Sequence, residues 1–208
     1  MNANERTTVL DLPFKLNRIL CVSILLAAAG AMAAVHAASH ATLYPFGMCS
    51  NSHFLSANEY KIQMLAAGAR ICRDDNPFST CRSTADPDPA HWKWDSFDGV
   101  RRIKRDYPQL DWLPILGYEP KWAQSMDFAQ ASQSYGQYVY EAVKRYKPYV
   151  HYWESWNEPD LPGHAFFRGN GKDFFPYQKA CYLSAKKADP DCTVVFAGMC
   201  FANIEGCL

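Results

Sequence analysis

Short apolar segments alternate with longer segments of helical period along most of this chain. Apolar runs bounded by turn residues predict five strands, at 44–49, 69–73, 112–116, 150–156 and 193–197. Between them, apolar side chains recur every three or four residues, which predicts four helices. Because strands and helices alternate, the pattern predicts an α/β fold built on a parallel sheet.

The helical segments also carry signals for their ends and their buried faces. Ser56 followed by Glu59 predicts a capping box at the start of the first helix, and Gly68 predicts its end. Asp95 is expected to cap the second helix. The third and fourth helices are expected to bury the side chains that recur at helical spacing: Tyr135, Tyr138, Val139, Ala142 and Tyr146 in one, and Phe174, Tyr177, Cys181, Ala185 and Ala188 in the other.

Both a doubly wound sheet and a (β/α)8 TIM barrel fit this alternation. No G-x-G-x-x-G string follows the first predicted strand, which weakens the nucleotide-binding form of the doubly wound sheet. Polar clusters follow the second, third and fourth strands, at 73–76, 118–122 and 157–160. In a barrel the chemistry gathers where strands run into loops, so these clusters favour the barrel.

The N-terminal residues are typical of a targeting segment. Lys15 and Arg18 precede a run without charged residues from Ile19 to Val35, and small residues follow it. This pattern predicts a signal peptide over residues 1–37 and a secreted or extracytoplasmic protein beginning at Ala38. The alternative is an uncleaved membrane anchor at 19–35, because that run is close to the length that spans a bilayer.

A secreted protein meets an oxidising compartment, in which its cysteines can form disulfides. Of eight, Cys21 lies in the predicted signal peptide, and the odd number that remains leaves at least one thiol unpaired within the chain. We expect one or two disulfides, with Cys72 and Cys81, and Cys200 and Cys207, close enough in sequence to bridge loops. The alternative is that Cys49, Cys72 and Cys192 are buried strand residues that only pack.

Charge and motifs exclude several classes of protein. The 21 basic and 21 acidic residues give a formal net charge of zero, which argues against a nucleic-acid-binding protein. The strings typical of zinc proteases, P-loop nucleotidases and serine-elbow hydrolases do not occur. His151 and His164 lack partners at metal-ligand spacing, so no metal is expected.

The segment 151–161 carries the clearest chemical signal. Glu158 lies at the carboxyl end of a predicted strand, beside Asn157 and among aromatic residues. A carboxyl group in such a setting suits a general acid, and Asn157 can bind a hydroxyl group next to the bond being cleaved. Glu158 would then be one of the two carboxylates that glycoside cleavage needs. The alternative is that Asn-Glu-Pro is only a turn after a strand.

The wider string resembles the acid/base strand of the clan A glycoside hydrolases, most closely family 39, the β-xylosidase and α-iduronidase group. Glu-Ser-Trp-Asn-Glu-Pro-Asp-Leu at 154–161 looks like their strand-four motif. Segments similar to other parts of their barrel follow in register, at 68–73, 92–98, 116–123 and 188–198, so that the resemblance covers roughly 44–198.

The resemblance implies a role for five residues. Glu158 would be the general acid/base, and Asn157 would hold the 2-hydroxyl group of the sugar. Arg73 would lie near the nucleophile and keep it ionised. Tyr118 and Trp122 would shape the sugar-binding cleft.

Two of the charged residues have structural alternatives. Arg73 could instead pair with Asp74 or Asp75 in a surface ion pair of little energetic value. Glu154, four residues before Glu158, would share its face if the strand stays regular. Glu154 is expected to be a buried structural carboxylate rather than a second catalyst.

The resemblance also implies a second carboxylate, the nucleophile, on strand seven of the barrel. Residues 38–208 correspond to about the first five β/α units, so the nucleophile strand is absent from this sequence. We therefore expect an incomplete barrel, as a fragment or truncated form of a secreted retaining O-glycosyl hydrolase. Its substrate would be an oligosaccharide or polysaccharide, and no cofactor is expected. The alternative is a non-catalytic secreted carbohydrate-binding remnant of such a barrel.

Overall fold

A computed structural model describes residues 46–50, 54–74, 87–161 and 166–200. Contacts divide the chain into two units, Met1–Leu43 and Tyr44–Leu208, and all the described residues lie in the second. The predicted signal peptide or anchor therefore lies outside the described residues. Within those ranges no helix is both long and apolar enough to cross a membrane.

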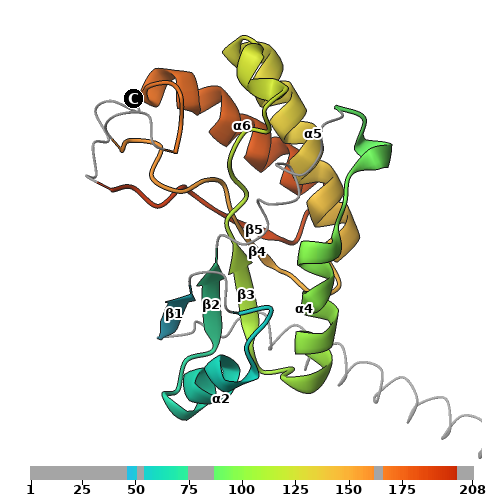
Figure 1. Ribbon diagram of the computed structural model, residues 1–208, viewed down its shortest axis with the longest axis vertical. Coiled ribbons are helices and arrows are strands. Elements are labelled where there is room, and N and C mark those ends of the chain that lie inside the picture. The colour runs from blue at the N-terminus through green and yellow to red at the C-terminus, as the bar shows by residue number, and fades with distance from the viewer. Residues whose placement is uncertain (1–45, 51–53, 75–86, 162–165, 201–208) are drawn as a thin grey trace, which may run out of the picture. The chain divides into compact units, whose positions relative to one another are not determined.

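The described residues form five parallel strands, three in one sheet and two in a second (Figure 1). They are β1 (Gly47–Ser50), β2 (Ile71–Asp74), β3 (Asp111–Pro114), β4 (Tyr152–Glu154) and β5 (Thr193–Val195). β2 pairs with β1 and β3, and β4 pairs with β5. A backbone bridge between Ile115 and Glu154 joins β3 to β4, where the Leu116 N–H donates to the Glu154 carbonyl at 2.8 Å. All five predicted strands are therefore confirmed, each shorter than its apolar run.

The order of the strands in space is their order in the chain. A doubly wound sheet reverses its strand order at a switch point, whereas a barrel places successive strands side by side. The series from β1 to β5 has no reversal. This order favours the barrel over the doubly wound alternative and confirms the α/β class with parallel strands.

Within the described ranges, four α-helices alternate with these strands: α2 (Asn58–Ala66), α4 (Asp95–Asp106), α5 (Phe128–Tyr146) and α6 (Gly171–Ala188). Short 3-10 turns lie at η2 (Pro89–His91) and η3 (Ala123–Ser125). The end predicted for α2 is confirmed, because Gly68 has φ +85° just beyond it.

Both predicted N-caps are wrong. Ala57 occupies the N-cap of α2, so no capping box opens at Ser56. Trp94 occupies the N-cap of α4, which places Asp95 inside the first turn. An acidic side chain there still interacts favourably with the helix dipole, so the sequence signal was real but its position was one residue off.

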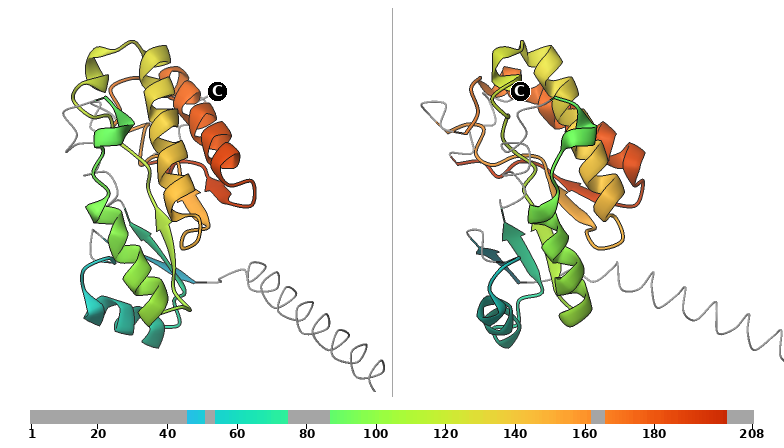
Figure 2. Two further views of the ribbon diagram at one scale, coloured as in Figure 1. Left: turned by 90° about the vertical axis from the view of Figure 1, so that its right-hand side faces the viewer. Right: turned by 45° about the vertical axis from the view of Figure 1, so that its right-hand side comes forward.

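Helices α5 and α6 lie side by side in both sets of views (Figures 1 and 2). The faces predicted to be buried are buried, except that Ala188 at the end of α6 is half-buried. The Tyr135 hydroxyl reaches the Leu116 carbonyl at 2.6 Å and also contacts the Ser155 carbonyl. Helix α5 is thereby fixed to the chain just beyond β3 and β4, where the candidate site lies.

The prediction of disulfides is wrong for the cysteines that the structure describes. All five described cysteines are free thiols, including Cys72 and Cys200, so neither of the two pairs that lie close in sequence forms a bridge. Cys72 is fully buried within β2, and burial raises its pKa to about 11, which disfavours the thiolate that disulfide exchange requires. Cys72 and Cys192 are buried, as the packing alternative predicted, whereas Cys49 is exposed.

Candidate active site

An ion pair between the half-buried Arg73 and the buried Glu154 lies at the carboxyl ends of β2 and β4. Arg73 Nε donates to Glu154 Oε2 at 2.7 Å, and Arg73 Nη2 donates to Glu154 Oε1 at 2.8 Å. The Glu154 side chain is 2% exposed and that of Arg73 is 30% exposed. Burial lowers the pKa of the Arg73 guanidinium, but the hydrogen bonds and charge of Glu154 outweigh burial and raise that pKa above its usual value. Arg73 therefore stays charged.

Asn157 is attached to the same pair. Arg73 Nη2 donates to Asn157 Oδ1 at 2.7 Å. Since a guanidinium has only donors, the contact fixes the amide so that oxygen faces Arg73 and Nδ2 faces the other way. Asn157 is half-buried, and its amide hydrogens are the part of this group that a ligand hydroxyl could meet.

The chain after β5 also contacts the Arg73–Glu154–Asn157 group. The Gly198 N–H donates to Glu154 Oε1 at 2.8 Å. A Cβ atom at Gly198 would lie 2.9 Å from Arg73 Nη2, closer than Cβ atoms come to other atoms, and 3.1 Å from Glu154 Oε1, which is tighter than most Cβ contacts. Position 198 therefore favours glycine, because any side chain would have to displace Arg73 or Glu154 for the backbone to approach the ion pair.

Glu158 has an unusual backbone conformation. Its φ is +44°, in the left-handed region that non-glycine residues rarely adopt. Its N–H donates to the Gly198 carbonyl at 2.7 Å, and its carbonyl accepts from the Leu161 N–H at 3.1 Å. Such conformations cost about 1–3 kcal/mol and gather at functional sites. The strained residue is the one that the sequence singles out as the general acid/base.

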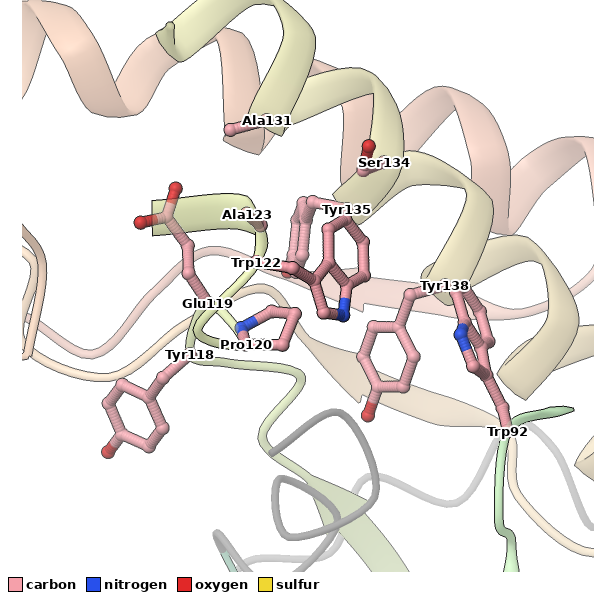
Figure 3. A pocket seen from close by; sticks show the side chains of 10 residues that line it. All are labelled: Trp92, Tyr118, Glu119, Pro120, Trp122, Ala123, Ala131, Ser134, Tyr135 and Tyr138. Carbon is pink, nitrogen blue, oxygen red and sulfur yellow. The ribbon is translucent and has the colours of Figure 1, made fainter. Parts of the chain in front are cut away.

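The loop after β3 holds the other two predicted site residues. Tyr118 is half-buried, with its ring edge-on to Trp156 at 5.6 Å. Trp122 lines a pocket with Trp92, Tyr135 and Tyr138, and Figure 3 shows the Tyr118 ring directed away from it. The space in that pocket is about 20 Å³, enough for one water molecule and far too small for a sugar. The structure thus brings Arg73 and Asn157 together and places Trp122 in an aromatic pocket that Tyr118 also lines.

A second buried ion pair lies in the same loop. The Glu119 carboxylate accepts from Arg168 Nε at 2.6 Å and from the Tyr177 hydroxyl. Its side chain is 7% exposed. Sequence reasoning missed the pairing, because Arg168 and Tyr177 come from a loop and a helix far along the chain.

The surface ion pair considered for Arg73 is wrong for Asp74, because Asp74 is buried and accepts from Ser50 Oγ at 3.0 Å and from the Phe54 N–H at 3.3 Å. Asp75 lies outside the described residues. Glu154 is buried, as predicted. Among the residues that the structure describes, no group of three or more His, Cys, Asp or Glu side chains could hold a metal ion.

The described strands run parallel in chain order, with charged and amide side chains at their carboxyl ends, as in an α/β fold. The solved structures that this chain resembles in fold include clan A glycoside hydrolases with TIM barrels. The fold resemblance expected from the sequence is thereby confirmed. A scan against protein-family models finds no match. A search of the curated proteins finds none either.

Three solved structures resemble this chain in fold. A bacterial orthologue of human α-L-iduronidase superposes with a TM-score of 0.54 at 18% identity, over 71% of this chain and 26% of that one. A family 39 glycoside hydrolase from the gut symbiont Bacteroides cellulosilyticus WH2 gives 0.51 at 22% identity, over 74% and 32%. Xylanase 10B from Thermotoga maritima gives 0.51 at 16% identity, over 72% and 48%. This chain thus spans less than half the length of each, and at these identities the likeness is one of fold.

Proposed function

We propose that this chain carries the acid/base half of the active site of a retaining O-glycosyl hydrolase. The observation that supports this most strongly is the Arg73–Glu154–Asn157 group, which lies next to the strained Glu158 at the carboxyl ends of parallel strands. Chemistry in barrels gathers at that end. An ordinary turn after a strand requires neither a buried ion pair nor a left-handed glutamate.

Each residue has a task in this proposal. Glu158 protonates the leaving oxygen in the first step and, as a carboxylate, activates water in the second. The Asn157 amide donates to the 2-hydroxyl group of the sugar in the cleavage subsite. Arg73, held in the charged state, keeps the nucleophilic carboxylate ionised.

Glu154 is excluded as that nucleophile. Both of its oxygens are engaged, by two nitrogens of Arg73 and by the Gly198 N–H. A carboxylate that is 2% exposed and bound in this way is not accessible to an anomeric carbon. The second carboxylate, placed about 5–5.5 Å from Glu158 in retaining enzymes, must come from outside the described residues.

The proposed substrate is an oligosaccharide or polysaccharide met outside the cell. The names of the similar structures include an iduronidase and a xylanase, which makes iduronic acid and xylose the sugars to test first. Tyr118 is proposed to contact the substrate. Trp122 is proposed to act only by shaping the loop that carries Tyr118, since its own pocket is too small for a sugar.

Hydrolysis by the natural secreted protein tests the proposal. We would measure release of the aryl group from an aryl β-xyloside and an aryl α-iduronide. Glu158→Ala should lower turnover by roughly 10²–10⁴-fold, the usual contribution of general acid/base catalysis. Azide should restore turnover of the activated aryl glycoside and give a glycosyl azide, because azide attacks the anomeric carbon without a base.

Asp160→Asn is the matched control, since it neutralises a carboxylate in the same loop while keeping an oxygen that can accept from the Cys200 N–H. The assignment is wrong if Glu158→Ala turns over as fast as Asp160→Asn. Saturable binding of xylobiose without hydrolysis would instead support the carbohydrate-binding alternative. The intact mass and terminal peptides of the same preparation would check the predicted start at Ala38.

A further inference from the structure

We propose that Glu154 is a positioning residue that sets the hydrogen-bonding polarity of Asn157 through Arg73. This inference rests on the proposed function, in which Asn157 donates to the 2-hydroxyl group of the sugar. It adds a task for Glu154, which does not touch the substrate.

The geometry that carries the inference is a relay of three side chains. Glu154 engages two nitrogens of Arg73, Nε and Nη2, at 2.7 and 2.8 Å. Such a two-point contact fixes the plane of the guanidinium as well as its position. The second hydrogen of Nη2 then points to Asn157 Oδ1 at 2.7 Å. The amide of Asn157 can therefore offer only its N–H donors on the opposite side.

Glu154 is itself held from another strand. The Gly198 N–H, after β5, donates to the same oxygen, Oε1, that accepts from Arg73 Nη2. The relay therefore joins β2, β4 and the chain after β5. A neutral side chain at 154 would keep the shape of the group but remove the charge that aligns Arg73.

A second buried ion pair supplies a matched control. Glu119 and Arg168 are 2.6 Å apart, and the Glu119 side chain is 7% exposed. Both Glu119→Gln and Glu154→Gln remove one buried carboxylate from one arginine, so they should cost comparable stability. Only Glu154→Gln removes the carboxylate that binds Arg73.

The first test needs no ligand and no activity. In the ¹⁵N-labelled full chain, the Asn157 side-chain amide signals are compared among the wild type, Glu154→Gln and Glu119→Gln. The inference predicts that these signals shift in Glu154→Gln and stay in place in Glu119→Gln. Unmoved Asn157 signals in a folded Glu154→Gln protein would overturn it, and so would equal shifts in both variants.

A second variant covers the case in which Glu154→Gln does not fold. Arg73→Lys keeps a positive charge beside Glu154, but a lysine has no planar fork that can bind Glu154 and Asn157 together. The inference predicts that the Asn157 amide signals shift in Arg73→Lys as well. If they remain at the wild-type positions, the relay does not exist.

A kinetic measurement on the natural protein tests whether the relay affects catalysis. The preference for an aryl glycoside over its 2-deoxy analogue, as a ratio of kcat/KM, should fall about 10-fold or more in Glu154→Gln and stay unchanged in Glu119→Gln. That range corresponds to the loss of one hydrogen bond between substrate and enzyme. Absence of hydrolysis in the wild type would count against the proposed function alone, because the spectroscopic test still decides on the relay.

Discussion

The variant Gly198→Ala adds one methyl group next to Arg73 and Glu154, and so tests how tightly the candidate site is packed. In Gly198→Ala the new Cβ would lie 2.9 Å from Arg73 Nη2 and 3.1 Å from Glu154 Oε1. The end of a long side chain can usually move aside at little cost. Here it cannot move freely, because Arg73 is held by Glu154 and Asn157 at 2.7–2.8 Å.

The expected cost follows from those contacts. Forcing a methyl group into a well-packed site costs about 1–3 kcal/mol. Displacing Arg73 far enough to break one hydrogen bond to a charged group costs about 1.5–3 kcal/mol. Alanine offsets part of this, about 0.4–1 kcal/mol, by restricting the unfolded chain. Overpacking and the loss of a hydrogen bond are alternative ways to accommodate the same methyl group, so only one of these costs applies. We therefore expect Gly198→Ala to lower the free energy of unfolding by about 0.5–2.5 kcal/mol, or the Tm by about 1–10 °C.

Gly117→Ala is the matched control. A Cβ at Gly117 would meet only the Trp156 ring, at 3.6 Å or more, which is ordinary van der Waals contact. Its unfolding free energy should stay within about 0.5 kcal/mol of the wild type. Urea unfolding followed by fluorescence and by circular dichroism would give both values. Equal stability of the two variants would show that Arg73 is not confined as the structure indicates.

Three further predictions concern single residues. Glu158→Gly should be more stable than Glu158→Ala by about 1 kcal/mol in the same urea assay, because only glycine adopts φ +44° without strain, and a less stable glycine variant would contradict that conformation. Tyr135→Phe should lower the free energy of unfolding by about 1–2 kcal/mol, since it removes the hydroxyl that contacts the Leu116 and Ser155 carbonyls, and a neutral result would show that these buried carbonyls find other donors. The folded-state pKa of Cys72, about 11, lies above the unfolded value near 9, so the stability it contributes is present below pH 9 and is lost as the pH rises through 11. Unfolding free energies measured from pH 8 to 11 should fall less steeply in Cys72→Ala, and parallel curves would refute the shift.

Much of the fold could be predicted because it depends on local periodicity. Helices α5 and α6 bury the faces that their sequence spacing predicts, and all five strands occur where apolar runs were found. The boundaries were less predictable, since a strand ends where its partners end. The apolar run 150–156 forms a ladder only at Tyr152–Glu154, because the chain then bends toward Gly198 and leaves the regular pleat.

The candidate site was predictable residue by residue but not as an arrangement. Asn157 and Glu158 stand in a recognisable string, and the resemblance pointed to Arg73. The partner of Arg73, however, is Glu154, 81 positions along the chain, and no spacing rule joins residues so far apart. The sequence offered Asp74 instead, whose side chain the structure directs to Ser50. The preference for glycine at 198 likewise follows only from a close approach in space.

The strained backbone of Glu158 and the Arg73–Glu154 ion pair both depend on the pairing of β4 with β5. The chain after β5 supplies the N–H that binds Glu154 and the carbonyl that binds the Glu158 N–H, both from Gly198. One residue therefore fixes both the buried carboxylate that aligns Arg73 and the backbone that presents the proposed acid/base. Since neither contact exists within β4 alone, the Asn-Glu-Pro string is not sufficient for the site. A chain with this string but with a bulky residue at the position of Gly198 would have the motif without the geometry that we propose for catalysis.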